Sequence, residues 1–185
     1  MAKAPPRFLA LLRGINVGGK NVIAKDDLRQ LFEDLGCRNV RTYIQSGNIL
    51  FRSDTTSVKQ ITTVIEEGLS DRFSYRAQAV VLSHRKCKSA LRSAPGDWGK
   101  NDEQKHNALF TLSGHTPRRA LAQLPTPQTD IETVTSGPGV IFWSASKKQL
   151  TQTTMIKLPA SPVYQRMTVR NHNTVFKLLE LFEDV

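Results

Sequence analysis

The residues of this chain best suited to chemistry form a glycine-rich segment directly after the short apolar run 8–12. The segment reads Arg13-Gly14-Ile15-Asn16-Val17-Gly18-Gly19-Lys20-Asn21. A loop of this composition can turn backbone N–H groups and positive charge toward one anion. We therefore expect an anion-binding loop, in which the candidate ligand contacts are Arg13, Gly14, Asn16, Gly18, Gly19, Lys20 and Asn21.

Residues 14–20 also match the letters G-x-x-x-x-G-K of the nucleotide-binding P-loop. Two features count against that interpretation. Asn21 stands where a Ser or Thr would hold magnesium, and the next helical periodicity begins only at Leu28. An interpretation without any ligand is also open, because glycines permit the positive φ angles that a tight crossover from strand to helix requires.

A second polar segment, Gln45-Ser46-Gly47-Asn48, separates two expected strands at residues 40–45 and 49–52. Ser-Gly-Asn is typical of a tight turn, and Ser46 and Asn48 also carry side chains that can hydrogen-bond a ligand. The strand at 40–45 should run parallel to the strand at 8–13, so both would end at the same edge of a sheet. We therefore predict that Gln45, Ser46 and Asn48 lie beside the glycine-rich loop.

A third candidate lies before the last helix, where Arg170 and Asn171 precede His172. Asn171 is suited to cap that helix. The alternative places Arg170 and His172 at the helix N-terminus as a second anion contact, with Arg170 and Asn171 as candidate ligand residues. Residues 133–179 hold six basic side chains and no acidic one, which indicates a solvated basic face or the footprint of a polyanion.

Composition favours an anionic partner. The chain has 185 residues, with 26 Lys and Arg against 16 Asp and Glu, and a net charge of +10. Such a surplus attracts polyanions, and we predict nucleic acid or a nucleotide as the partner. The alternative is a basic protein without a dedicated partner, because charge alone confers no specificity.

Signatures of catalysis are missing from the sequence, and no catalytic residue is predicted. The four histidines do not have zinc-ligand spacing, and no Ser-His-acid arrangement or nucleophile elbow is recognisable. Cys37 and Cys87 do not form a disulfide framework, so we expect neither a metal nor a cofactor. No apolar segment is long enough for a signal peptide or a membrane span. We expect a reduced, cytoplasmic protein without membrane contact; the sequence does not determine its oligomeric state.

The order of expected elements predicts the fold class. Strands at 8–13, 40–45, 49–52 and 77–82, with helices stopping at Gly36 and starting after Ser57, give the order βαββαβ. The second half repeats this order. We predict an α+β fold of two ferredoxin-like βαββαβ repeats with antiparallel sheets, plus linking and C-terminal helices. The expected segments are an N-terminal repeat at 1–83, a linking helix and loop at 84–106, and a C-terminal repeat at 107–185.

Two blocks of the sequence, residues 11–21 and 40–48, resemble the signature blocks of the bacterial domain of unknown function 1697. The tail at 168–171, with 173–175 and Leu178, is similar to the third block of that family. His172 stands where the family usually carries an aromatic residue, often Trp. The resemblance implies a cytoplasmic α+β protein with ferredoxin-like repeats and no established activity.

Three functional hypotheses follow. The leading one is a phosphate-binding module for nucleic acid or a nucleotide at the loop edge. The second is an enzyme that acts on a small phosphorylated or carboxylated substrate at the same edge, which would require a deep pocket there. The third is a protein-interaction module, which would require an exposed apolar patch.

Overall fold

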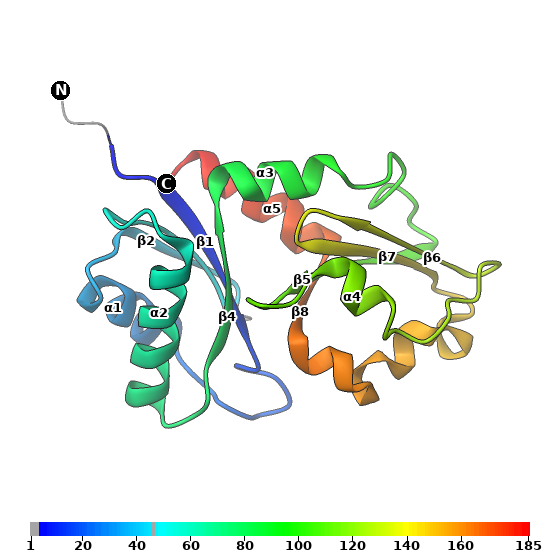
Figure 1. Cartoon of the computed structure of the whole chain (residues 1–185), viewed down its shortest axis with the longest axis horizontal. Helices are drawn as coiled ribbons and strands as arrows, with labels where there is room; N and C mark the ends of the chain where they lie inside the picture. The colour runs from blue at the N-terminus through cyan, green and yellow to red at the C-terminus, as the bar shows by residue number, and fades with distance from the viewer. Residues whose placement is uncertain (1–3, 46) are drawn as a thin grey trace. The chain divides into compact units, whose positions relative to one another are not determined.

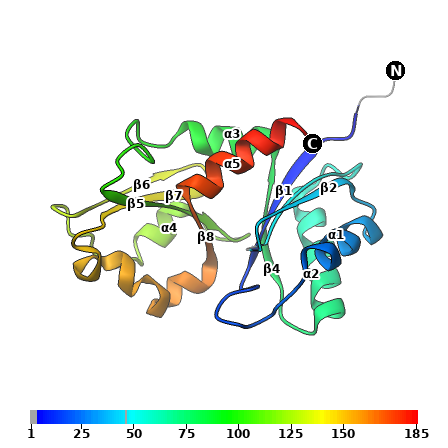
Figure 2. The same cartoon turned by 180° about the vertical axis from the view of Figure 1, so that it is seen from behind.

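The computed structural model describes residues 4–45 and 47–185, and the chain divides into two compact units. Unit 1 comprises Met1–Cys87 together with Leu178–Val185, and unit 2 comprises Lys88–Lys177. Each unit contains one four-stranded antiparallel sheet (Figures 1 and 2). The predicted α+β fold with two ferredoxin-like repeats is confirmed.

Unit 1 has the element order β1 (Arg7–Arg13), α1 (Lys25–Asp34), β2 (Arg38–Tyr43), β3 (Asn48–Arg52), α2 (Val58–Phe73) and β4 (Gln78–Ser83). Its strands lie in the order β2-β3-β1-β4. Both β1 and β2 pair antiparallel with β3, so they run parallel to each other and end at the same edge. This topology brings the two segments after these strands together.

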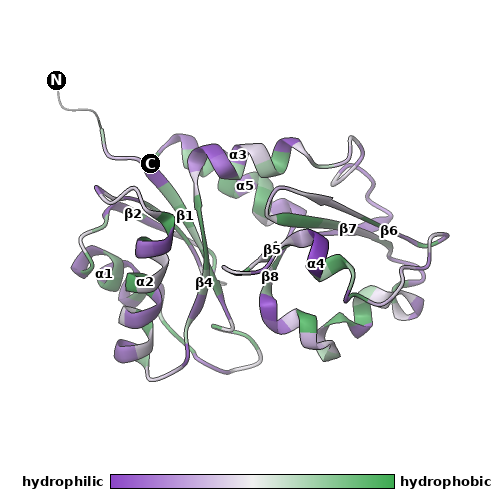
Figure 3. Ribbon diagram, viewed as in Figure 1, coloured by the Kyte–Doolittle hydropathy of each residue, from purple (hydrophilic) through white to green (hydrophobic). Residues whose placement is uncertain are grey.

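The core of unit 1 explains the unbroken apolar run in β1. Phe8 and Leu12 belong to the cluster under α1 and α2, where Phe8 stacks on Phe51 with ring centroids 5.7 Å apart. Leu9 and Leu11 on the opposite face of the strand are also buried. A strand buried on both faces cannot alternate apolar and polar residues. Figure 3 shows hydrophobic colouring along much of β1.

Helix α1 ends, and helix α2 begins, with the local hydrogen bonds that the sequence predicts. At the end of α1, Gly36 N–H donates to Glu33 O over 2.9 Å and Cys37 N–H donates to Phe32 O over 3.0 Å. Gly36 has a φ of +81°, so these bonds form a Schellman motif. At the start of α2, Ser57 Oγ accepts from Gln60 N–H over 3.3 Å.

Unit 2 has the element order β5 (Gln104–Thr111), α4 (Pro117–Leu121), β6 (Glu132–Gly137), β7 (Val140–Ser146), three 3-10 segments η1 (Leu150–Gln152), η2 (Thr154–Ala160) and η3 (Pro162–Arg166), and β8 (Met167–Asn171). Its strand order β6-β7-β5-β8 repeats that of unit 1. The 3-10 segments replace the second helix of the repeat. Pro159 and Pro162 lack the N–H that a continuous α-helix would need here.

A buried carboxylate joins these 3-10 segments to the sheet of unit 2. Glu132 is 3% exposed. It accepts hydrogen bonds from Trp143 Nε1, from Gln128 N–H, and from both the N–H and the hydroxyl of Thr154, over 2.6–2.9 Å. The sheet face around Trp143 is completed by Met155, Leu158 and other apolar side chains.

Two helices contain the points at which the chain passes from one unit to the other: α3 (His84–Arg92) and α5 (His172–Glu183). The last eight residues belong to unit 1, where Arg7 Nη1 donates to Phe182 O over 2.8 Å and Arg52 Nη2 donates to Val185 O over 2.6 Å. The segments expected at 1–83, 84–106 and 107–185 stay a prediction about the order of repeats along the chain. No helix in the described residues is long and apolar enough to cross a bilayer.

Candidate functional site

The glycine loop, residues 14–24, connects the end of β1 to the start of α1. Its tip is a two-residue turn in which Lys20 N–H donates to Val17 O over 3.1 Å. The central residues Gly18 and Gly19 have φ angles of +59° and +73°. Positive φ at both positions is the pattern of a type I′ turn, so the turn itself requires these glycines.

Two asparagines hold the loop in shape. Asn16 Nδ2 donates to Ile23 O over 3.0 Å and to Gln45 O over 2.7 Å, while Asn16 Oδ1 accepts from Ile23 N–H over 2.8 Å. Asn21 Nδ2 donates to Gly14 O over 2.8 Å. Both residues have positive φ, which asparagine tolerates better than most other residues. Their amide groups therefore bind the chain itself.

The structure brings the glycine loop and the β2–β3 turn together, as the topology predicts. Besides the Asn16 bond to Gln45, Leu12 N–H donates to Gly47 O over 2.7 Å. A Cβ atom on Gly47 would lie 2.7 Å from Leu12 Cβ, so only glycine permits this approach. Ser46 lies outside the described residues. Asn48 is 1% exposed, and its Nδ2 donates to Tyr43 O over 3.0 Å, so it shapes the turn from within.

At the exposed tip of the loop, two backbone N–H groups and one ammonium group are available to bind a ligand. The backbone N–H groups of Gly18 and Gly19 donate no hydrogen bond within residues 4–45 and 47–185. The ammonium of Lys20 is exposed and has no ion-pair partner in the same part of the chain. Arg13 is half-buried at the end of β1, opposite Gln78. The tip can therefore present two N–H donors and one ammonium to an anion.

The geometry differs from that of a nucleotide-binding P-loop. In a P-loop the lysine lies at the start of a helix whose N-terminus faces the phosphates. Here α1 begins at Lys25, well after Lys20, and Asn21 directs its side chain back to Gly14. No helix N-terminus therefore lies beside Lys20 in the described structure.

Sequence reasoning missed an apolar component of the same edge. Val17 is 65% exposed, Val22 is 75% exposed and Ile44 is 41% exposed. Ile44 also has a φ of +48°, a conformation that is unusual for a β-branched residue. The sequence did contain a signal for it. Two valines flank the loop glycines, at positions where a loop exposed to solvent usually has polar residues.

The last two candidate residues belong to unit 2. Arg170 is 7% exposed, and its Nη1 donates to Thr168 Oγ1 and Val169 O over 2.8 Å. Burial lowers the pKa of this guanidinium to about 10. Asn171 Oδ1 accepts from Thr174 N–H over 2.8 Å, so Asn171 caps α5. Each side chain thus has bonds within unit 2.

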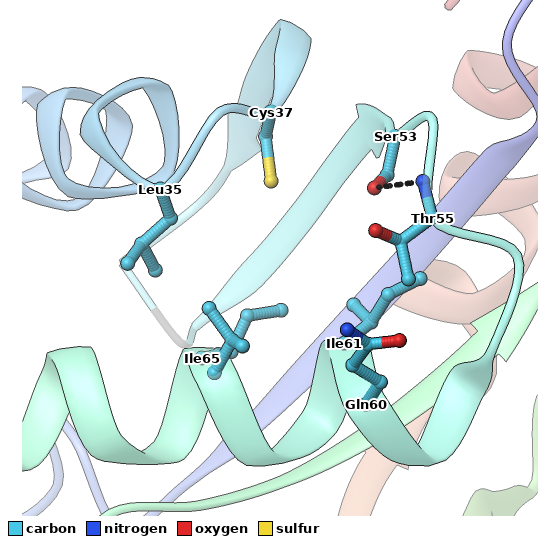
Figure 4. Close-up of a pocket in the computed structure, with 8 residues that line it drawn as sticks. Leu35, Cys37, Ser53, Thr55, Gln60, Ile61 and Ile65 are labelled. Carbon is cyan, nitrogen blue, oxygen red and sulfur yellow. Dashed lines mark hydrogen bonds between the residues drawn. The ribbon is translucent and has the colours of Figure 1, made fainter.

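A small pocket of about 90 Å³ lies elsewhere in unit 1, between α2 and the segments after α1 and β3 (Figure 4). Its apolar wall includes Leu35 and Ile65, and its polar end includes Ser53 and Thr55. The Cys37 thiol points into the space between them. Burial raises the pKa of Cys37 to about 11, so the thiol stays protonated and is a poor nucleophile at neutral pH.

A Ser–His pair in unit 2 is also absent from the sequence-based expectations. His106 Nε2 lies 3.0 Å from Asn101 O, which can only accept, so Nε2 carries the proton. His106 Nδ1 then accepts from the Ser144 hydroxyl over 2.8 Å. Because His106 is 1% exposed and packs against Trp98, we interpret the pair as a structural bond between β5 and β7. The residues are 38 positions apart, so only strand pairing reveals them.

Comparisons with known proteins give a family match and a solved structure with the same fold. A family model described as "Protein of unknown function (DUF1697)" matches residues 6–142. A solved structure, that of the conserved bacterial protein SP0830 from Streptococcus pneumoniae, is 30% identical and superposes with a TM-score of 0.87. The match covers 97% of this chain and 99% of that one. No curated protein matches the chain.

Proposed function

We propose a function for this chain, which belongs to the DUF1697 family: it binds a phosphate group, carried by a nucleotide or a nucleic acid, at the tip of the glycine loop. The observation that carries the proposal is the pair of unpartnered N–H groups on Gly18 and Gly19, next to the exposed ammonium of Lys20. Adjacent N–H groups beside a cation form an electropositive concavity suited to a phosphate oxygen.

The rigidity of the loop supports this proposal. Asn16 and Asn21 fix the loop with four side-chain hydrogen bonds before any ligand arrives. A preorganised loop loses little conformational entropy on binding, so more of the interaction energy appears as affinity. The overall charge of +10 adds a long-range attraction for anions.

The test is thermal stability and calorimetric titration with inorganic phosphate, nucleotides and short oligonucleotides at low and moderate salt. A ligand at about 100 times its dissociation constant should add about 2.7 kcal/mol to the stability of the wild-type protein. Lys20→Ala should weaken binding roughly ten- to hundredfold, because a charged hydrogen bond contributes about 1.5–3 kcal/mol.

Lys25→Ala is the matched control, since Lys25 is also exposed and starts α1 only a few residues later. It removes the same charge without touching the loop tip, and should leave the affinity within about twofold. If no phosphate ligand stabilises the wild type, or if both variants lose affinity equally, the loop is not a phosphate site.

A second candidate function is favoured by the exposed side chains of Val17, Val22 and Ile44. Three apolar side chains at one edge of unit 1 are suited to contact with another protein surface. The double variant Val17→Ser with Val22→Ser tests association with a second copy of the chain by sedimentation velocity. Concentration-dependent association that this variant abolishes, together with an unchanged phosphate response, would support the interaction surface. A monomeric wild type at all concentrations would exclude association with a second copy.

A further inference from the structure

A basic surface of unit 2 is independent of the glycine loop. Unit 2 holds 12 Lys and Arg residues and 5 Asp and Glu residues, a surplus of 12 − 5 = 7 of the total charge of +10. Most of the excess charge therefore belongs to unit 2, whereas the glycine loop belongs to unit 1. The charge needs an explanation separate from the loop.

The six basic residues of 133–179 are not all free surface charges. Lys148 pairs with Glu103 over 3.0 Å, and Lys147 Nζ donates to Asp102 O over 2.6 Å. Arg170 is buried, and Lys177 is half-buried on α5. Of the six, only two remain exposed and without a partner among the described residues: Lys157 and Arg166.

The fold adds two arginines from another part of the chain. Arg118 and Arg119 lie on α4 and are exposed. Apolar residues of α4, η2 and η3 pack into one cluster on the same face of the sheet. Figures 1 and 2 show α4 and the 3-10 segments on the same side of the sheet of unit 2. We call the four exposed cations of these segments the basic layer: Arg118, Arg119, Lys157 and Arg166.

Nothing within this layer neutralises it. The four charged groups make no hydrogen bond or ion pair within residues 4–45 and 47–185. The sequence has no acidic residue between Glu103 and Asp130, and none between Glu132 and Glu180. The carboxylate of Glu132 is buried and bound by four donors, so it does not offset the surface charge.

We propose that the basic layer binds the phosphate backbone of nucleic acid. Cations without bound counter-charges gain most from neutralising phosphates, because the condensed counterions of the nucleic acid are released. A basic surface made for membranes combines its cations with large apolar anchors. Of the exposed large apolar side chains in the described residues, only Ile156 lies on these elements, at 49% exposure. The chemistry of the layer therefore matches a sugar–phosphate backbone and not a lipid surface.

The experiment measures the affinity of the full chain for labelled DNA and RNA duplexes of about 20 base pairs, between 50 and 200 mM salt. Four phosphate contacts give a slope of about −3.6 in log K against log salt, which is a roughly 100-fold loss over this range. The test variant replaces the four cations of the basic layer by alanine. Its slope should fall to that of one contact at most, about −0.9, and its affinity at 50 mM salt should fall at least tenfold.

A matched control removes four exposed cations that also lack partners in the described residues, but from unit 1. These residues are Lys59, Arg76, Arg85 and Lys86. The control has the same net charge as the test variant and should keep most of the wild-type slope. A third variant replaces the three arginines of the basic layer by lysine and should also keep the slope, since the charges remain.

Three outcomes would overturn the proposal: a wild type that binds neither duplex, equal losses in the test variant and the control, or binding to phosphatidylserine vesicles without binding to duplexes. Lys20→Ala is assayed alongside. The basic-layer variant should keep the phosphate response of the glycine loop, and Lys20→Ala should keep the duplex slope to within one contact. Either proposal can therefore fail while the other stands.

Discussion

The side-chain amides of Asn16 and Asn21 donate to backbone carbonyls of their own chain and so fix the shape of the glycine loop. The glycine-rich composition left open a tight crossover from strand to helix with positive φ angles, and Gly18 and Gly19 do have positive φ. The sequence did not show that both asparagine amides are occupied by the chain itself. One acceptor of Asn16 is the carbonyl of Gln45, 29 residues away, and local pattern carries no information about such a bond.

Glu132 was not singled out as a site residue, yet its buried carboxylate accepts four hydrogen bonds. Burial alone would raise the pKa of this carboxyl, but hydrogen bonds from Thr154, Gln128 and Trp143 outweigh burial and hold the pKa below 4.5. Because the charged form receives these bonds only in the folded state, ionisation of Glu132 stabilises the fold.

We predict that Glu132→Gln lowers the free energy of unfolding by about 2–4 kcal/mol at pH 7. The amide of glutamine offers one acceptor oxygen and would turn an N–H₂ group toward donors that need acceptors. The wild-type contribution should be complete above pH 4.5, the ordinary value, and be lost as the pH falls through the lowered folded pKa. Urea unfolding between pH 3 and 7 measures this. A wild type and a variant whose stabilities fall in parallel with pH would contradict it.

Most elements followed from periodicity and capping residues, because these signals depend on neighbours within one or two turns. The Schellman motif at Gly36 and the cap at Ser57 are examples. The stretch from η1 to η3 takes the place of the second helix of the predicted repeat, but it forms 3-10 turns. Its conformation depends on Pro159 and Pro162 and on the hydrogen bonds from Thr154 to Glu132, which lies on β6.

Gly36 provides a test at the scale of one helix. A Cβ atom there would meet nothing within 4 Å, so Gly36→Ala changes only the backbone preference at a φ of +81°. We expect a loss of about 1 kcal/mol in the free energy of unfolding, from the strain of alanine in the left-handed region.

Gly96→Ala is the control for this change. Gly96 also has open space around its Cβ position, but its φ is not in the left-handed region. Alanine should therefore be neutral or stabilise by up to about 1 kcal/mol, because it restricts the unfolded chain. Equal effects of both substitutions in urea unfolding would mean that the Schellman motif does not account for the conformation of Gly36.

At the scale of the whole molecule, the sequence predicted two repeats but not the distribution of charge or of the chain between them. The run 133–179 looked like one basic face, whereas Lys147 and Lys148 bond to residues 102 and 103 and Arg170 is buried. The exposed cations of the basic layer come from α4, η2 and η3. The last eight residues follow unit 2 along the chain but belong to unit 1. Membership of a unit depends on long-range packing, which the order of elements does not encode.

Phe182 tests the role of these last residues in unit 1. Its side chain is fully buried and contacts His84 edge-on, with ring centroids 5.0 Å apart. Phe182→Ala should lower the free energy of unfolding by about 3–5 kcal/mol, as expected when a buried aromatic ring leaves a cavity. Hydrogen exchange should increase more in β1 and β4 than in β6 and β7, because unit 1 loses the contact.

Phe176→Ala on the same helix is the matched comparison. Phe176 is 44% exposed and belongs to unit 2, where its ring lies 5.5 Å from Trp98. The same truncation should lower the free energy of unfolding by about 1 kcal/mol. A ring that is nearly half exposed buries less apolar area in the folded state, so its removal costs less. A larger loss for Phe176→Ala, or an equal rise in exchange across both sheets after Phe182→Ala, would mean that the end of α5 is not a specific part of unit 1. A larger loss for Phe182→Ala, with exchange raised mainly in β1 and β4, would show that a segment at the end of the sequence completes the first repeat.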